Sequence, residues 1–430
     1  MRFRVGRDAF GEAVAFVSRA LPSRPVVPLL SGMLMEAEGE RLTISCFDYE
    51  VSARCRVDAE VIEAGTALVP GRLLAEITRS LPARPVECSR DADLLNLVCG
   101  TAEFGLVCLP ADDYPALPES PAAIGTVDGG ALAAAVSQVA SSASRDDTLP
   151  MLTAIFVDVD GDLLTLAATD RYRLAARQVP VVPADPDLRA VALVPARIMV
   201  EATRMMAAAK PVTLAFDAGE RAARSSGQHG RGGDDNRPHT AEGLISFEVA
   251  ERRLTARLIG GEFIKYQSRL AGDFNCRADL APGPVIEAVR RASLVAERAG
   301  PVRLTFGDGR VMIEAHAEGR ARAAETIAAD FVGDQPAISF NPVYLLDGLV
   351  AASVCATSES DEPVTGATGS EADREADESA AEGRIRLQFN TAARPALITW
   401  VSPGEARAEV AGTIPAFRYL LVPLRVPDRA

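Results

Sequence analysis

The densest group of side chains that could do chemistry is Thr169-Asp170-Arg171-Tyr172-Arg173. A carboxylate, a phenol and two guanidinium groups this close together could bind an anion or transfer a proton. The group follows an apolar run, which predicts a buried strand that ends in an exposed bend. No histidine, cysteine or second carboxylate stands at a matching spacing, and no glycine-rich phosphate loop follows a strand. The sequence therefore favours binding, with an enzyme that uses Asp170, Tyr172 and Arg173 as an alternative.

The same register occurs once earlier in the chain, 122 positions upstream and without a gap. Gly39 corresponds to Gly161, and Asp48 corresponds to Asp170. A third, more degenerate copy begins near Cys276. Three units of about 125 residues are too long for a solenoid and suit a tandem of small α+β domains. The predicted bounds of the domains are 1–121, 122–273 and 274–430.

Each unit is expected to contain two helices and several short antiparallel strands. Asp8 is an adequate N-cap for the first helix, and Pro70 stands in the first turn of the second. The expected helices cover about 8–20, 70–81, 131–142 and 284–298, with two more that start at about 194 and 342. The strands of the second unit are expected near 153–159, 162–168, 172–179, 211–217, 244–250 and 254–259, and those of the third near 302–306, 311–313, 384–389, 396–401 and 405–411.

The second helices of the first two units carry the same basic pattern. Arg72 and Arg79 are seven residues apart, and so are Arg197 and Arg204. Residues at this spacing lie two turns apart on one helical face, so each helix offers a basic stripe. One such pair is consistent with a solvated helix face, but its repetition favours an electrostatic role that the two helices share. The third unit has valines in their place, at 343 and 350.

The net charge of −14 is concentrated in one segment. Residues 356–383 contain nine Asp or Glu and one Arg, a net of −8. We expect a disordered acidic insertion there, which as alternatives could repel DNA, mimic DNA or recruit a basic partner. Residues 219–242 are rich in Gly, Arg, Asp and Ser, and four Arg balance four acidic residues. This composition predicts a flexible insertion in a hairpin, with a DNA-binding arm as the alternative.

The remaining composition indicates a cytoplasmic protein without a metal or cofactor. The seven cysteines are odd in number and form no Cys-x-x-Cys pair, so buried reduced thiols are expected. The three histidines stand apart from any cluster of metal ligands. No apolar run approaches the length of a membrane span, and the N-terminus carries no signal peptide. Aromatic residues make up only 5% of the chain, so the core should be aliphatic.

Three motifs on this threefold repeat resemble the bacterial sliding clamp family, the beta subunit of DNA polymerase III. The segment 168–174 is similar to the family's Thr-Asp-x-x-Arg-Leu signature. The segment 422–426 is similar to its hydrophobic-Pro-hydrophobic-Arg ending, and 111–115 matches the loop that closes its first domain. The resemblance covers the whole chain apart from the two insertions.

The resemblance implies a non-catalytic processivity factor. Two subunits would join head to tail into a ring of six domains, with sheets outside and helices around a hole that holds duplex DNA. Polymerases, the clamp loader and repair proteins would bind it through short peptides. Basic helices around the hole could attract phosphates without reading bases, which permits sliding.

The resemblance also implies three sets of site residues. The groove for client peptides would be formed by Leu152, Thr169, Arg171, Tyr172, Arg173, Leu174, Pro395, Leu420, Val422, Pro423 and Leu424. DNA would face Arg24, Arg72, Arg79, Arg197 and Arg204. At the contact between subunits, Phe104 and Leu106 of one subunit would meet Leu294 and Val295 of the next, with an internal core position as the alternative for each.

The segment around Asp170 has a special meaning under this resemblance. Asp48 occupies the same place in a unit where no groove is expected, so Asp170 is interpreted as a structural anchor. The second unit alone carries Arg171-Tyr172-Arg173, so any unusual client preference should originate there. Arg171 and Tyr172 are bulkier than the residues of some members. A divergent paralogue with altered clients or altered ring closure is therefore an alternative.

Overall fold

The computed structural model describes residues 1–206, 211–217, 243–296, 300–317, 319–334, 337–359, 383–403 and 415–425, with the backbone of 239–240. Most of the two predicted insertions and the strand expected at 405–411 lie outside these residues. The expectations for them therefore stay predictions. Among the described helices, none has both the length and the apolar composition needed to cross a bilayer.

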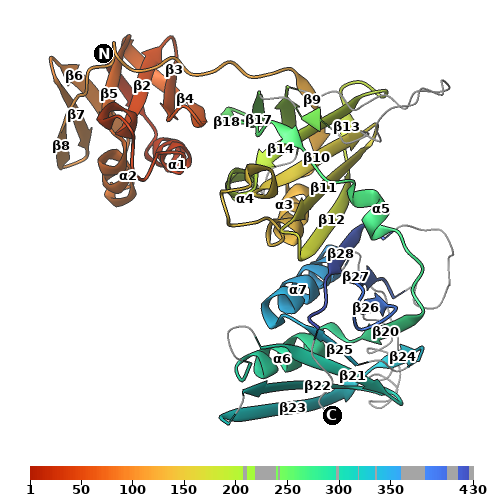
Figure 1. Ribbon diagram of the computed structural model, residues 1–430. Coiled ribbons are helices and arrows are strands. Elements are labelled where there is room, and N and C mark those ends of the chain that lie inside the picture. The colour runs from red at the N-terminus through yellow and green to blue at the C-terminus, as the bar shows by residue number, and fades with distance from the viewer. Residues whose placement is uncertain are drawn as a thin grey trace, which may run out of the picture.

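Three similar units follow one another along a curved arc, with their helices on the concave side and their sheets on the convex side (Figure 1). Each unit contributes one pair of packed helices, as expected. The pairs are α1 (Arg7–Ser18) with α2 (Gly71–Ser80), α3 (Gly129–Ala140) with α4 (Ala196–Met206), and α6 (Pro282–Ser293) with α7 (Pro342–Glu359). A short helix, α5 (Tyr266–Leu270), follows the second unit.

The strands pair antiparallel throughout the described residues. The first unit has β1 (Arg2–Val5), β2 (Gly32–Glu38), β3 (Arg41–Phe47), β4 (Val51–Glu63), β5 (Gly65–Pro70), β6 (Val86–Asp91), β7 (Leu94–Cys99) and β8 (Ala102–Val107). The second has β9 (Ala123–Val127), β10 (Ala154–Asp160), β11 (Leu163–Thr169), β12 (Arg173–Pro180), β13 (Val182–Pro183), β14 (Arg189–Pro195), β15 (Val212–Phe216), β16 (His239–Thr240), β17 (Leu244–Val249), β18 (Arg252–Arg257) and β19 (Gly261–Glu262). The third has β20 (Cys276–Leu280), β21 (Val302–Gly307), β22 (Arg310–Ala317), β23 (Ala321–Ala328), β24 (Asp330–Val332), β25 (Ala337–Phe340), β26 (Arg384–Phe389), β27 (Ala396–Val401) and β28 (Phe417–Leu421).

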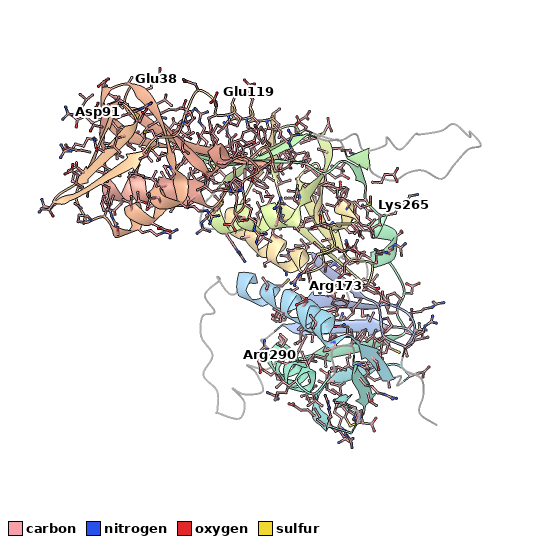
Figure 2. All side chains as sticks on the ribbon, turned by 60° about the vertical axis from the view of Figure 1, so that its left-hand side comes forward. Glu38, Asp91, Glu119, Arg173, Lys265 and Arg290 are labelled. Atoms are coloured by element: carbon pink, nitrogen blue, oxygen red, sulfur yellow. The ribbon has the colours of Figure 1, made fainter. Side chains whose placement is uncertain are left out.

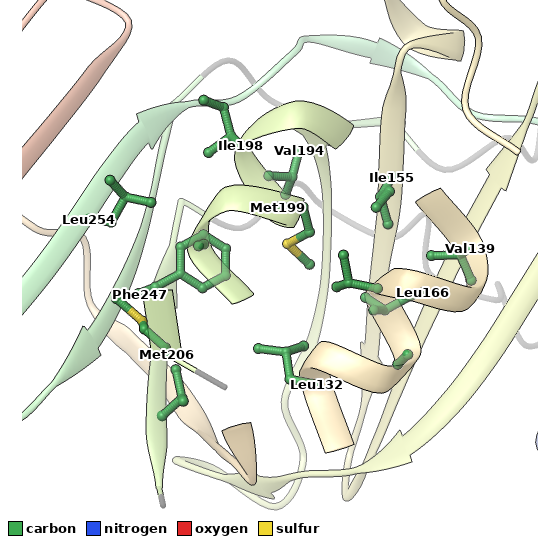
Figure 3. Close-up of a cluster of buried hydrophobic side chains, with 14 of the residues drawn as sticks. Leu132, Val139, Ile155, Leu166, Val194, Ile198, Met199, Met206, Phe247 and Leu254 are labelled. Carbon is green, nitrogen blue, oxygen red and sulfur yellow. The ribbon is translucent and has the colours of Figure 1, made fainter. Parts of the chain in front are cut away.

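The core of each unit lies between its helices and its sheets. In the second unit, Leu132 of α3 and Met199 of α4 face Leu166 of the sheet, and aliphatic side chains fill most of the space between them (Figure 3). Their burial removes apolar surface from water, which is the main source of stability. The expectation of an aliphatic core is thereby confirmed. All seven cysteines are free, and six of them are buried.

Two sheets continue from one unit into the next. Strand β18 of the second unit pairs with β4 of the first unit, and β28 of the third unit pairs with β12 of the second. By contrast, β8 of the first unit and β23 of the third each have one edge that pairs with no other strand of the described chain. These two edges lie at opposite ends of the arc.

Some local expectations were wrong. The helix expected at 284–298 ends at Ser293, and Leu294 already lies in a turn with 82% of its side chain exposed. The apolar spacing continues through Val295 and Ala296, but periodicity shows which face is buried and does not mark where a helix ends. The strands β5, β14 and β25, which lead into the second helix of each unit, were not expected.

Candidate functional site

The bend between β11 and β12 is built around Asp170. Its Oδ1 accepts hydrogen bonds from the backbone N–H groups of Tyr172 and Arg173, each at 3.0 Å. Arg171 has a φ of 78°, a left-handed conformation that is uncommon for a residue other than glycine. Thr169 Oγ1 donates to the carbonyl of Arg173 at 2.6 Å. The carboxylate therefore holds a tight turn that presents Arg171 and Tyr172 outward.

The same turn occurs in the first unit. Asp48 Oδ1 accepts from the backbone N–H groups of Glu50 at 3.0 Å and Val51 at 2.7 Å. Tyr49, between them, has a φ of 71°. The prediction that Asp170 is a structural anchor is confirmed, because the carboxylate does the same work in a unit that lacks Arg171-Tyr172-Arg173.

Arg173 is the residue that the second copy adds at the centre of the site. Its side chain is only 9% exposed, and its guanidinium lies 2.9 Å from Asp170 Oδ2 and 2.5 Å from Asp347 Oδ2. It also lies 4.3 Å from the ring centre of Tyr344 and donates to the Tyr419 hydroxyl at 3.4 Å. Burial lowers the pKa of Arg173, but Tyr419, Asp347 and Asp170 together raise the pKa above its usual value. The guanidinium therefore stays charged at the boundary between two units.

These contacts join the second unit to the third. Asp347 and Tyr344 belong to α7 and Tyr419 to β28, and Figure 2 places Arg173 beside α7. None of these three partners of Arg173 was expected from the sequence. The signal that could have revealed Asp347 is the repeat itself, because Glu76 of α2 and Glu201 of α4 hold the corresponding position in the other units.

The two predicted walls of the groove are adjacent strands. Arg173 pairs with Leu421 in the ladder between β12 and β28, and Leu174 pairs with Leu420. The backbone N–H of Val422 donates to the carbonyl of Tyr172 at 2.9 Å. Pro395 directly precedes β27, whose Ala396 pairs with Leu421. Residues from three distant parts of the chain therefore meet along one edge.

The groove residues differ in exposure. Leu152, Thr169, Arg173, Leu174 and Pro423 are buried, Leu420 and Leu424 are half-buried, and Arg171, Tyr172, Pro395 and Val422 are exposed. A hydrophobic cluster that contains Leu174 and Leu397, with Leu420 packed against it, forms an apolar floor. The backbone carbonyl of Leu152 accepts a hydrogen bond from the N–H of Ser144 at 2.7 Å, and Ser144 lines the cavity beside the Asp170 bend.

A cavity of about 540 Å³ opens beside the bend. It is lined by Ala143, Ser144, Arg145, Asp146, Asp170, Arg171, Tyr172, Arg173, Val343, Tyr344 and Asp347. The rings of Tyr172 and Tyr344 stack with their centres 6.2 Å apart, and Tyr172 is 60% exposed. The mouth of the site is therefore aromatic and charged, whereas its floor is apolar.

The predicted basic stripes lie on exposed helical positions. Arg72, Arg79, Arg197 and Arg204 are all exposed on α2 and α4, whose ribbons line the concave side of the arc (Figure 1). Glu201 lies 3.8 Å from Arg204 and 3.2 Å from Arg19 of the first unit. Arg24 is exposed in the loop after α1. Glu38, Asp91 and Glu119 lie on the opposite, sheet-covered side (Figure 2).

The four predicted contact residues lie near the two ends of the arc. Leu106 on β8 is buried within its own unit, and Phe104 is half-buried. Leu294 is 82% exposed just after α6, and Val295 beside it is half-buried. The structure does not bring the two pairs together within one chain. Leu294, at least, cannot be explained as an internal core residue.

An arc of three repeated units, with basic helices inside, sheets outside and an unpaired strand edge at each end, defines the class of ring-forming DNA clamps. Models of the N-terminal, central and C-terminal domains of the DNA polymerase III beta subunit match residues 1–118, 126–265 and 273–355. The chain belongs to this family, the bacterial beta sliding clamps.

Relatives and solved structures agree with this assignment. The chain is 42% identical to the beta sliding clamp of Streptomyces coelicolor over 99% of this chain and 100% of the relative. It superimposes on the sliding clamp of Bacillus subtilis with a TM-score of 0.79 at 23% identity, covering 99% of both chains. A sliding clamp from Pseudomonas aeruginosa bound to griselimycin gives a TM-score of 0.77 at 23% identity, covering 99% of this chain and 100% of that one.

Family membership establishes what the protein does. It is a DNA sliding clamp of replication, and it has no catalytic activity of its own. The clamp encircles duplex DNA as a dimer and tethers the replicative polymerase and other clients through short peptides. The alternative of an enzyme at Asp170, Tyr172 and Arg173 is thereby excluded.

Proposed function

We propose that client peptides bind in the groove between the second and third units. The groove residues are Leu152, Thr169, Arg171, Tyr172, Arg173, Leu174, Pro395, Leu420, Val422, Pro423 and Leu424. The observation that carries the proposal is the pairing of β12 with β28, because it places the Asp170 bend next to the C-terminal segment. The Pseudomonas clamp bound to griselimycin supports the capacity of this fold to hold a ligand.

The groove has the chemistry that an extended peptide needs. The apolar floor around Leu174 and Leu420 can accept leucine or phenylalanine anchors. The exposed Arg171 and the stacked ring of Tyr172 add a charged and an aromatic contact at the mouth. Arg173 acts mainly as a positioning residue, since its guanidinium is already occupied by Asp170 and Asp347.

Peptide affinity and dimer mass test this assignment together. Leu152→Asp and Leu424→Asp should each weaken binding of a polymerase-derived clamp-binding peptide at least tenfold and leave the dimer mass unchanged. Leu94→Asp, at an exposed position of β7, is a matched control that should retain peptide affinity. Unchanged peptide affinity in both groove variants would refute the groove. A stable dimer that binds no polymerase-derived peptide would instead favour the divergent paralogue.

We infer that Arg24, Arg72, Arg79, Arg197 and Arg204 face duplex DNA in the hole of the ring. The exposure of all five side chains supports this inference. Guanidinium groups on rigid helices attract phosphates of any sequence, which permits sliding. The acidic side chains on the sheet-covered side disfavour DNA outside the ring.

The two unpaired edges indicate how subunits would join. Strands β18 and β28 pair with β4 and β12 of the preceding units. Because β8 corresponds to β18 and β28, and β23 corresponds to β4 and β12, β8 of one subunit should pair with β23 of the next. At the first junction Leu254 stands opposite Ala53, and at the second Tyr419 stands opposite Ala175. We infer that a large side chain faces an alanine at every junction.

The hairpins of the repeat give the register at the subunit contact. Leu254 and Phe104 are each the third residue of the strand after their hairpin turn. Ala53, Ala175 and Ala323 pair with corresponding residues of β3, β11 and β22. Phe104 should therefore face Ala323 of the partner, with Leu106 beside it and Leu294 and Val295 close by.

The domain bounds of 1–121, 122–273 and 274–430 stay predictions, which limited proteolysis can test. We also infer a cytoplasmic location, because the clamp acts on replicating DNA. Fractionation of cells would test it, and recovery of the protein outside the cytoplasmic fraction would contradict it.

A further inference from the structure

The junction of the first and second units carries arginines that the clamp function does not use. In the ladder between β4 and β18, Arg54 stands directly opposite Arg253. Directly opposite residues project from the same face, and like charges in such a pair destabilise the ladder. Arg56 lies two positions further along β4 and shares this face. The neighbouring Ala53 and Leu254 are buried in the helix-covered core, so the three arginines face the convex side.

Most acidic groups around this face already have partners. Glu248 lies 2.7 Å from Arg253 and accepts a hydrogen bond from Ser120. Glu251 pairs with Arg41 at 2.9 Å. Arg252 points to the opposite face, where it lies 2.7 Å from Glu12. The charge of Arg253 is thus balanced by Glu248, whereas Arg54 has no ion pair of its own among the described residues, and Glu36 is the acidic group that raises its pKa.

Two polar atoms here are buried and unpaired. Within the described residues, neither Arg54 Nε nor Ser45 Oγ has a hydrogen-bond partner. Ser45 is 1% exposed and stands directly opposite Arg54 in the ladder between β3 and β4. Leaving a buried donor without a partner is costly, so a group that accepts a hydrogen bond from it would be bound favourably.

The electrostatics point to an anion. Burial lowers the pKa of Arg54, and the charge of Arg56 lowers the pKa further. Glu36 raises this pKa, and Arg253 lowers it. A negative charge placed between these guanidinium groups would relieve their repulsion, and guanidinium forks bind oxyanions through paired hydrogen bonds.

The size of the cavity restricts the ligand. It measures about 40 Å³ and is lined by Arg54, Arg56, Glu248, Ala250, Glu251, Arg252 and Arg253. A water molecule needs about 10–15 Å³ by the same measure, so the cavity holds one small group. A base or a sugar would not fit.

We propose that this junction binds a single free tetrahedral oxyanion of phosphate or sulfate size. Arg54 and Arg56 donate to its oxygens, and Arg253 shares its charge between the anion and Glu248. Arg54 and Arg56 belong to the first unit and Arg253 to the second. The bound anion therefore links the two units on the outside of the ring, away from the DNA and from the peptide groove.

Calorimetric titration of the full-length dimer with inorganic phosphate tests the site, with potassium chloride at equal ionic strength as the blank. The wild type should show one saturable site per subunit. Arg54→Met keeps the apolar stem of the side chain and should raise the Kd for phosphate at least tenfold. Arg253→Met provides a second variant should the first fail to form dimers, and it should also weaken binding.

Arg418→Met is the matched control. Arg418 holds the position of Arg253 at the second junction, but it stands opposite Ala176 and faces no second arginine there. This variant should bind phosphate as the wild type does. Absence of saturable binding above the chloride blank, or an unchanged Kd in both Arg54→Met and Arg253→Met, would overturn the proposal. An equal loss of phosphate affinity in Arg418→Met would contradict the proposed location of the anion site.

Discussion

The half-buried pair of Arg173 and Asp347 should couple the second and third units energetically. Removing one partner of a buried ion pair costs about 3–5 kcal/mol. Asp347 is 36% exposed, however, and water screens a charge on this side of the pair. Arg173→Met also removes the contacts with Asp170, Tyr344 and Tyr419. We therefore expect a destabilisation of about 3 kcal/mol for Arg173→Met and about 1–2 kcal/mol for Asp347→Asn.

A double-mutant cycle isolates the pair. Urea unfolding followed by the fluorescence of Trp400, the one tryptophan of the chain, reports on the third unit directly. The double variant should be less destabilised than the two single variants together, by a coupling energy of about 1–2 kcal/mol.

The exposed pair of Arg189 and Asp160 provides the control for this cycle. Its side chains are 62% and 48% exposed at a distance of 3.1 Å, so its coupling energy should stay within about 0.2–1 kcal/mol. If the effects of Arg173→Met and Asp347→Asn add to within about 0.3–0.5 kcal/mol, the pair does not couple the units.

Three further predictions concern the ring, the hole and the core. Ala323→Trp should block the proposed contact with Phe104 and shift the protein from dimer to monomer in analytical ultracentrifugation, whereas Ala324→Trp, on the other face of β23, should remain a dimer. Replacing Arg72 and Arg79 by Ala should reduce the slope of log K for duplex DNA against log salt by about 0.9 for each phosphate that the variant no longer neutralises, and Arg303→Ala on the outer sheet should leave this slope unchanged. Burial raises the pKa of Cys46 and of Cys88 to about 12, so the folded state keeps protons that the unfolded state has released. The free energy of unfolding should fall as pH rises from about 9 towards 12, by up to about 1.4 kcal/mol per pH unit for each thiol. In Cys46→Ala, the free energy of unfolding measured in urea should fall less steeply with pH, and an equally steep fall in the variant would contradict this explanation.

The repeat and its main elements could be predicted from the sequence because local patterns specify them. The helices follow apolar spacing and proline positions, and the turn at Gly39 has the positive φ of 61° that glycine adopts easily. The Asp170 bend could be predicted because its counterpart Asp48 stands in the same register. The groove required the family resemblance, since no local pattern shows that β12 and β28, so far apart in the chain, are neighbours.

Other features depend on tertiary contacts that local patterns do not specify. Tyr344 and Asp347 bind Arg173 across a unit boundary, and each of them alone is compatible with an ordinary helix surface. The opposition of Arg54 and Arg253 depends on the register between strands of different units. Periodicity predicted the buried face of α6 but not its end, because Ser293 is followed by more residues with apolar spacing.

The first unit shows why we propose a groove at only one of the two copies of the bend. There Phe47 stands where the second unit has Thr169, and its backbone N–H donates to the Tyr114 hydroxyl at 2.8 Å. Tyr114 packs with Leu30, the counterpart of Leu152, and Leu117 of the same linker covers them. The chain thus fills this surface of the first unit with its own aromatic side chains. In the second unit a threonine stands at this position, and Tyr266 of α5 donates to Asp158 Oδ2 at 3.1 Å. The surface beside Arg171 and Tyr172 therefore stays uncovered by the chain's own linker, in agreement with the proposed groove.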